Sequence, residues 1–299
     1  MENCSRCETL PEPLEGTGKF IVSTPLNHTL GKIKDIFDGH GHPYSMKDAE
    51  LLYSTISAEG LKTLADDLES NLSDAELQDV QSLWMEDDLE LKMSDLSRMS
   101  SLENLIAKVE GDWLIQILRE ERLYDVFQPI VLAEDPSQIH GYECLLRAES
   151  TDGETISPGR IFGTAQKSDL LFQLDRQARI EAVKNARNIP VNKKLFINFM
   201  PTSIYDAEYC LQTTMEAVSE YDIRKEQLVF EVVETEEIKD REGLIEILNY
   251  YRNEGVAVAL DDLGAGYSSL NLLKNLNPDY IKLDLELVQS VEENELQAQ

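Results

Sequence analysis

The chain has 299 residues and a formal net charge of −30, from 57 acidic and 27 basic side chains. This excess of negative charge argues against DNA, RNA or an anionic membrane as a general partner, although one small anionic ligand could still bind through a metal ion. The hydrophobic content of 42% is enough for a sizeable core, and the length suits one large domain or two ordinary ones.

The sequence predicts a cytoplasmic protein without a membrane segment, because no apolar run approaches membrane-spanning length and the first residues carry no apolar signal region. Cys4 and Cys7 form a Cys-x-x-Cys pair, and His40 and His42 form a His-x-His pair. Together these four side chains could bind a structural zinc ion. The alternative is that they are ordinary residues of a terminal segment.

Residues 1–110 are predicted to form a mainly helical regulatory or dimerisation region. A capping arrangement at Ser45 predicts one helix, and the clearer capping box of Ser73 and Glu76 predicts another. An apolar stripe at helical spacing then predicts a long helix over residues 101–122.

From about Tyr124 the pattern changes to strands that alternate with helices. The predicted strands are 125–132, 141–147, 194–199, 227–233, 256–261 and 280–284. The predicted helices are 158–186, 204–219, 242–254 and 270–275. Repeated strand–helix units of this kind are typical of a parallel sheet or a barrel.

The strand at 256–261 ends on two adjacent carboxylates, Asp261 and Asp262, which a glycine turn at Gly264 and Gly266 follows. Two neighbouring carboxylates repel each other, so the pair favours a bound cation. Solvated acids at the end of a strand are the alternative, because turns favour Asp and Gly in any case.

Other predicted strands carry polar residues inside apolar runs: Glu143, Asn198, Glu231, Lys282 and Asp284. A buried charge is costly unless it is paired. In a parallel barrel the carboxyl ends of the strands converge on one mouth, so these side chains are expected to meet there. Carboxylate and amide oxygens are hard ligands, which favour Mg²⁺ or Mn²⁺.

Several segments, in this order, resemble signatures of the EAL domain family. They are Gln128-Pro-Ile, Glu143-Cys-Leu-Leu-Arg147 against Glu-Ala-Leu-x-Arg, Leu174-Asp-Arg176, Asn198, Glu231 with Glu234, the run from Asp261 to Leu270, and Asp279-Tyr-Ile-Lys-Leu-Asp284. The resemblance covers about residues 113–299. It implies a TIM-type (β/α) barrel that hydrolyses cyclic di-GMP to linear pGpG in bacterial signalling.

The resemblance also implies a role for each matching residue. Metal would be held by Glu143, Asn198, Glu231 and Asp261, with Asp262 and Asp284 at a second Mg²⁺ or Mn²⁺ ion. Lys282 would contact the attacking water, and Glu234 would brace the glycine loop. The substrate would be contacted by Gln128 and Arg147. Two such ions can activate water and clamp a phosphodiester. Arg147 could instead pair with a structural acid, and Glu234 could be a surface acid. Asp175, next to Arg176, is interpreted as a surface ion-pair residue and is left out of the site.

The expected barrel is incomplete at its C-terminus, because six strands are predicted after residue 124 and a closed barrel of this type needs about eight. The sequence therefore predicts an EAL-like phosphodiesterase domain at 111–299 that lacks its last strands. A homodimer is possible. The alternative function is a catalytically silent module that binds cyclic di-GMP or another protein.

Overall fold

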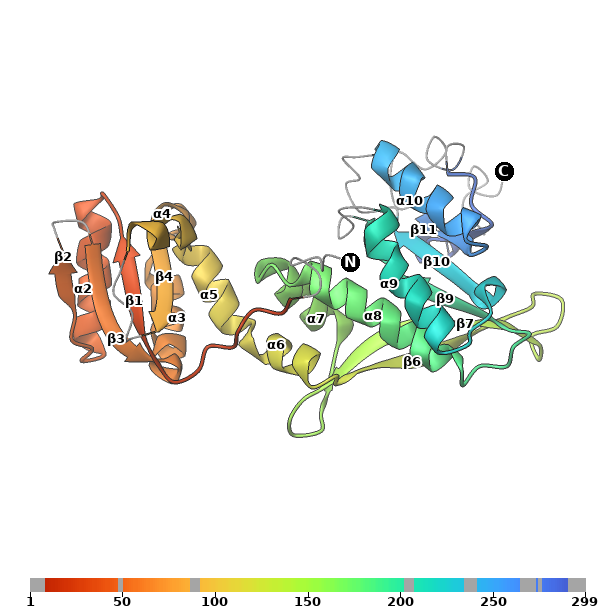
Figure 1. Ribbon diagram of the computed structural model, residues 1–299, viewed down its shortest axis with the longest axis horizontal. Helices are drawn as coiled ribbons and strands as arrows, with labels where there is room; N and C mark the ends of the chain where they lie inside the picture. The colour runs from red at the N-terminus through yellow and green to blue at the C-terminus, as the bar shows by residue number, and fades with distance from the viewer. Residues whose placement is uncertain are drawn as a thin grey trace. The chain divides into compact units, whose positions relative to one another are not determined.

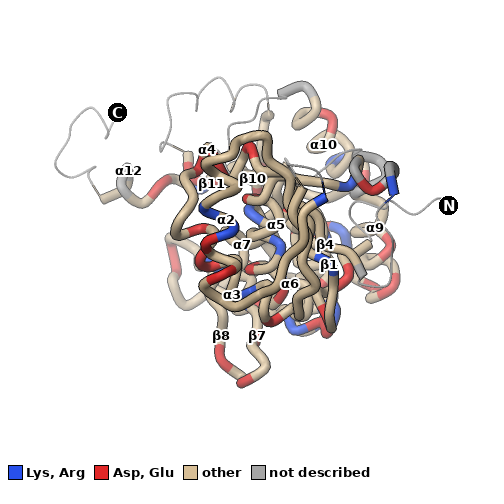
Figure 2. Tube along the Cα trace, turned by 90° about the vertical axis from the view of Figure 1, so that its left-hand side faces the viewer, with Lys and Arg blue, Asp and Glu red and all other residues tan. Residues whose placement is uncertain are grey.

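The computed structural model describes residues 9–47, 51–86, 92–201, 207–233, 241–263, 273 and 276–289. The chain divides into two compact units. The N-terminal unit comprises Leu10–Glu120 and Phe162–Leu170, and the C-terminal unit comprises Met1–Thr9, Glu121–Ile161 and Leu171–Gln299. Acidic residues occur on many elements of the chain and are interspersed with basic ones (Figure 2), so the negative charge is not confined to one site.

The N-terminal unit combines an antiparallel sheet with helices that pack on it (Figure 1). Its strands are β1 (Thr17–Ser23), β2 (Ser45–Lys47), β3 (Leu51–Ser57), β4 (Gln81–Glu86) and β5 (Ser100–Ser101), in the order β2-β3-β1-β4-β5. Its helices are α2 (Asn27–Gly39), α3 (Ala58–Asn71), α4 (Asp74–Asp79), α5 (Leu102–Glu110) and α6 (Asp112–Arg119), with a 3₁₀ turn η1 at Met93–Arg98. The expectation of a mainly helical region is therefore corrected to a mixed α/β unit.

The core explains why this unit contains a sheet. Phe20 of β1 and Leu52 of β3 are fully buried against Ile33 and Phe37 of α2 and against Leu64 of α3. Strand β3 alternates buried and less buried residues, which is the period of a strand with one face on a core. The predicted helix at Ser45 is wrong, because that serine begins β2, which pairs with β3.

The predicted single helix at 101–122 is two helices, α5 and α6, which meet at Gly111. A Cβ at Gly111 would lie 2.7 Å from the Cβ of Ser168, so only glycine permits this approach.

Of the zinc candidates, His40 and His42 have stacked rings and His40 Nε2 lies 2.5 Å from Asp67 Oδ2. Cys4 and Cys7 lie outside the described residues, so zinc binding stays a prediction.

The capping box predicted at Ser73 and Glu76 is confirmed at the start of α4. The Glu76 carboxylate also accepts hydrogen bonds from Lys32 Nζ at 2.8 and 2.9 Å and from Thr29 Oγ1 at 3.0 Å. The bonds from Lys32 and from the Ser73 backbone lower the pKa of Glu76 to about 2, against the opposing effect of its burial. Glu76 therefore joins α4 to α2.

We expect Glu76→Gln to lower the free energy of local unfolding of α4 by about 1–3 kcal/mol, because a charged cap and an ion pair are lost. Since the pKa is depressed on folding, the stabilisation is complete above the ordinary value near 4.5 and is lost as the pH falls toward about 2. Hydrogen exchange of α2 and α4 measures the effect. Asp79→Asn, an exposed change on the same helix, should stay within about 0.5 kcal/mol; equal effects of the two substitutions would contradict the prediction.

The C-terminal unit contains a mostly parallel sheet with helices along it (Figure 1). Its strands are β6 (Leu123–Val131), β7 (Ile139–Glu149), β8 (Thr155–Ile156), β9 (Lys194–Asn198), β10 (Leu228–Val233), β11 (Ala257–Leu263) and β12 (Tyr280–Leu283). Its helices are α8 (Leu171–Ala186), α9 (Ala207–Glu220), α10 (Arg241–Asn253) and α12 (Leu285–Gln289), with a 3₁₀ turn η3 at Lys225–Gln227; helix α7 (Pro158–Lys167) precedes α8. The strand order is β12-β11-β10-β9-β7-β6, with β8 paired to β7.

All the strands predicted after residue 124 are present, but one direction differs. Strands β7, β9, β10, β11 and β12 are parallel, whereas β6 runs antiparallel to β7. The predicted helix at 158–186 is also divided, into α7 and α8, by a turn in which Asp169 has a φ of +58°. Among the described strands the sheet runs from β12 to β6 as an open path.

The two faces of this sheet are packed differently. The outer face and the helices share a large apolar core, which includes Leu195, Phe230, Val258 and Tyr251. The inner face carries a smaller buried cluster of Phe196, Val229 and Ala259, against which Tyr280 and Ile130 pack. None of the described helices is both long and apolar enough to cross a membrane.

Candidate metal centre and active site

A polar layer lies directly above the inner apolar cluster, because each strand turns every second side chain to the same face. The apolar layer is Phe196, Val229, Ala259 and Tyr280, and the polar layer is Asn198, Glu231, Asp261 and Lys282, each two residues further along its strand. Strands β9 to β12 are parallel neighbours. Asn198 lies opposite Glu231, whereas Glu231 lies opposite Ala259, and the register between β11 and β12 shifts between Leu260 and Leu263. The parallel sheet thus gathers on one face side chains that are far apart in sequence.

Lys282 lies among three carboxylates. Its Nζ is 2.9 Å from Asp261 Oδ2, 3.1 Å from Glu143 Oε1 and 3.2 Å from Glu231 Oε1. One oxygen from each acid lies within 4.8 Å of the others. Asn198 Nδ2 donates to Glu143 Oε1 at 3.4 Å. The structure therefore brings together Glu143, Asn198, Glu231, Asp261 and Lys282.

Burial shapes the ionisation of this cluster. Glu231 is fully buried, and burial raises its pKa to about 8, with Glu143 and Asp261 adding repulsion and Lys282 opposing the rise. Burial opposes the charge of Lys282, but the attraction of the same three carboxylates outweighs it and raises the lysine pKa. The cluster is thus short of positive charge even with its lysine protonated.

The second pair of predicted metal ligands lies at the end of β11 and after β12. Asp262 has a φ of +55°, a left-handed conformation that Asp tolerates better than most residues, and its N–H donates to Asp261 Oδ1 at 2.9 Å. Burial raises the pKa of Asp262, and the charges of Asp261 and Asp284 raise it further. Asp262 and Asp284 therefore share one electrostatic environment with Asp261.

The predicted substrate residues lie on β7, which also carries Glu143, and on its neighbour β6. Gln128 of β6 is exposed and pairs in register with Glu143 of β7. Arg147 follows Glu143 along β7 on the same face of the strand, because side chains alternate between the two faces. Its Nη1 donates to the carbonyl of Leu146 at 2.8 Å. Glu234 lies outside the described residues, so its role stays a prediction.

The residues of the cluster fit a divalent metal ion. Glu231 Oε1 is buried and accepts no hydrogen bond from the described residues, although Lys282 Nζ is close enough for charge attraction. A buried carboxylate oxygen without such a bond is costly unless a cation completes its surroundings. Together with the other carboxylates and the Asn198 amide, it forms a set of hard oxygen donors suited to Mg²⁺ or Mn²⁺.

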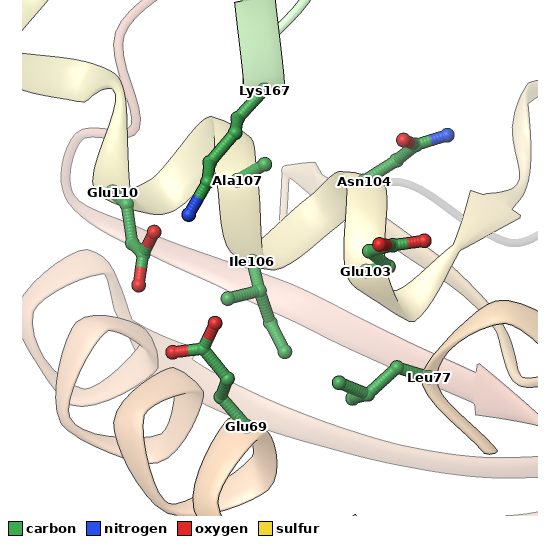
Figure 3. A pocket seen from close by; sticks show the side chains of 8 residues that line it. All are labelled: Glu69, Leu77, Glu103, Asn104, Ile106, Ala107, Glu110 and Lys167. Carbon is green, nitrogen blue, oxygen red and sulfur yellow. The ribbon is translucent and has the colours of Figure 1, made fainter. Parts of the chain in front are cut away.

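A separate cavity of about 230 Å³ belongs to the N-terminal unit. It is lined by Glu69, Leu77, Glu103, Asn104, Ile106, Ala107, Glu110 and Lys167, with the carboxylates of Glu69 and Glu110 turned toward each other and Lys167 pointing between the helices (Figure 3). Burial and the charge of Glu69 raise the pKa of Glu110, while Lys167 lowers it. The lining combines three carboxylates, Lys167 and Asn104 with three apolar side chains.

Comparison with known proteins agrees with this geometry. Residues 112–299 match the family model of the EAL domain, so the chain belongs to the EAL domain family. The assignment confirms the family that the sequence motifs indicate, and with it the TIM-like fold class.

Three relatives illustrate the match. The probable cyclic di-GMP phosphodiesterase PdeG of Escherichia coli is 31% identical over 54% of this chain and 32% of its own length. The PaMucR phosphodiesterase, solved in complex with c-di-GMP, is 27% identical with a TM-score of 0.54, over 62% of this chain and 76% of that one. A standalone EAL protein of Vibrio cholerae, solved with c-di-GMP bound, is 31% identical with a TM-score of 0.50, over 59% and 72%. The chain thus spans about a third of the length of PdeG.

Proposed function

We propose that this chain is a metal-dependent phosphodiesterase that hydrolyses cyclic di-GMP to linear pGpG in the cytoplasm. The observation that carries the proposal is the convergence of Glu143, Glu231 and Asp261 on Lys282 at the carboxyl ends of parallel strands. At this edge of a parallel barrel, catalytic groups from strands that are far apart in the sequence come together. The names of the relatives, which are phosphodiesterases or c-di-GMP complexes, support the same substrate.

In this proposal the protein supplies the metal ligands and the binding groups. Glu143, Asn198, Glu231 and Asp261 would hold one ion, and Asp262 and Asp284 would help to hold a second. Bound Mg²⁺ or Mn²⁺ would lower the pKa of a water molecule and neutralise the phosphodiester against the acidic protein.

Four further residues complete the proposed site. Lys282 orients the attacking water through its ammonium group, while Arg147 and Gln128 contact the substrate, the former through phosphate. Glu234 braces the loop after Asp262. The N-terminal region up to residue 110 is proposed as the regulatory or dimerisation part.

Glu143→Ala is expected to lower pGpG formation at least about 100-fold, because the substitution removes a metal ligand and an ion-pair partner of Lys282. The assay follows cyclic di-GMP and pGpG by chromatography with Mg²⁺ or Mn²⁺ present. Glu149→Ala, at the exposed end of the same strand β7, is the matched control and should retain wild-type turnover. Micromolar binding of cyclic di-GMP by the unsubstituted chain without pGpG formation would overturn the proposal and indicate a silent binding module.

A further inference from the structure

A buried ion pair lies on α8, behind the strand that carries Asn198. Asp175 and Arg179 are 3% and 2% exposed, and Arg179 donates to Asp175 Oδ2 from Nε at 3.0 Å, with Nη2 2.9 Å away. Arg179 Nη1 also donates to Thr214 Oγ1 of α9 at 2.6 Å. The interpretation of Asp175 as a surface residue beside Arg176 is wrong, because Asp175 is buried and pairs with Arg179.

The second oxygen of Asp175 has a different partner. Asp175 Oδ1 accepts the backbone N–H of Met200 at 2.9 Å, two residues beyond Asn198. The residue between them, Phe199, donates its N–H to the carbonyl of Glu231 at 3.1 Å. After β9, the backbone is therefore bonded to β10 at Phe199 and to the carboxylate of Asp175 on α8 at Met200.

We propose that Asp175 is a positioning residue for the metal centre. Its carboxylate fixes the backbone at Met200, and this fixes the Asn198 side chain against Glu143 at the level of the acidic cluster. Arg179 holds the carboxylate in the required orientation, since it binds the other oxygen. The inference rests on the proposed function for its consequence, metal binding, but the contact with Met200 stands on geometry alone.

Packing alone does not explain this arrangement. A buried ion pair is often no more stabilising than apolar side chains of similar volume, so the fold alone does not require Asp175 and Arg179. What apolar residues would not supply is an acceptor for the Met200 N–H. Groups outside the ligand shell that orient a metal ligand typically change metal affinity about 10- to 100-fold when they are removed.

Two double variants of the full chain isolate the acceptor. Asp175→Ala with Arg179→Met removes the pair and the acceptor, whereas Asp175→Asn with Arg179→Met removes the pair but leaves an amide oxygen for Met200. Neither variant leaves a buried charge without its partner, so both are expected to fold. We expect the Met200 amide to exchange about tenfold faster in the alanine variant than in the asparagine variant. Hydrogen exchange resolved by NMR measures this difference.

Mn²⁺ affinity, measured by calorimetry on the same proteins, tests the consequence. The alanine variant should bind Mn²⁺ about tenfold more weakly than the asparagine variant. Thr214→Val, which removes only the outer hydrogen bond of Arg179, should lower thermal stability without changing the Mn²⁺ affinity. Equal Met200 exchange or equal Mn²⁺ affinity in the two double variants overturns the positioning role. Absence of Mn²⁺ binding by the unsubstituted chain overturns the proposed function instead.

Discussion

Glu231→Gln is expected to weaken Mn²⁺ binding by more than about 100-fold and to reduce pGpG formation by at least as much. Glu231 is the fully buried member of the acidic cluster, and its Oε1 is a buried oxygen that accepts no hydrogen bond from the described residues. An amide of the same shape removes the charge while preserving the packing, so the loss reports on the ligand. Calorimetric titration with Mn²⁺ measures the affinity, and chromatography measures the product.

The raised pKa of Glu231 should make both Mn²⁺ affinity and stability depend on pH. Because the pKa of Glu231 is raised to about 8, metal must displace a proton below that pH, so Mn²⁺ affinity should increase from pH 6 to pH 8. In EDTA, which removes metal, the raised pKa of Glu231 contributes to the free energy of unfolding. This contribution is fully present below the ordinary pKa near 4.5 and is lost as the pH rises through about 8. Glu231→Gln should reduce both dependences.

The matched control is Glu226→Gln, because Glu226 is an exposed carboxylate just before the other end of β10. It should leave Mn²⁺ affinity, turnover and pH dependence unchanged. If the two substitutions weakened Mn²⁺ binding equally, Glu231 would have no special place in the metal centre.

Lys282→Met is expected to separate metal binding from chemistry. Without the ammonium group, the three acids keep their oxygens and lose a competing cation, so Mn²⁺ affinity should stay equal or increase. Turnover should fall at least about 100-fold, because no protonated group remains to orient the attacking water. Calorimetry and the product assay on one preparation give both values.

The same substitution should destabilise the metal-free protein. We expect a loss of about 2–3 kcal/mol at pH 8, less than for a fully buried pair because the Lys282 side chain is 28% exposed. Lys184→Met, which removes a partly exposed ion pair with Glu181 on α8, should cost less than about 1 kcal/mol. Loss of Mn²⁺ binding together with turnover in Lys282→Met would show that the lysine supports the ligands and not the reaction.

The acidic layer was predictable because strands have a simple period. A polar residue within an apolar strand, such as Glu231, must face a common interior if its neighbours two residues away do. Asn198, Asp261 and Lys282 were expected to meet it because the carboxyl ends of the strands in a parallel barrel converge on one mouth. The antiparallel direction of β6 was not predictable this way, because side-chain alternation is the same for both directions.

The N-terminal unit shows where local signals mislead. Ser45 looked like a helix cap, yet β3 forms because its alternating residues pack on α2 and α3, and long-range packing overrides a single cap. Gly111 lies within a continuous apolar stripe, so the spacing of the apolar residues did not indicate that α5 ends there. Asp175 was missed because its burial and its bond to the backbone of Met200 are visible only in three dimensions. The i, i+4 spacing of Asp175 and Arg179 within one predicted helix was the available signal.

The most direct test of the account is an anomalous-scattering map from crystals of the full chain grown with Mn²⁺. We predict a manganese peak bounded by the carboxylates of Glu143, Glu231 and Asp261, and its loss in Glu231→Gln. Well-ordered crystals with no manganese among these three carboxylates at millimolar Mn²⁺ would contradict the claim that the sheet gathers them to bind metal.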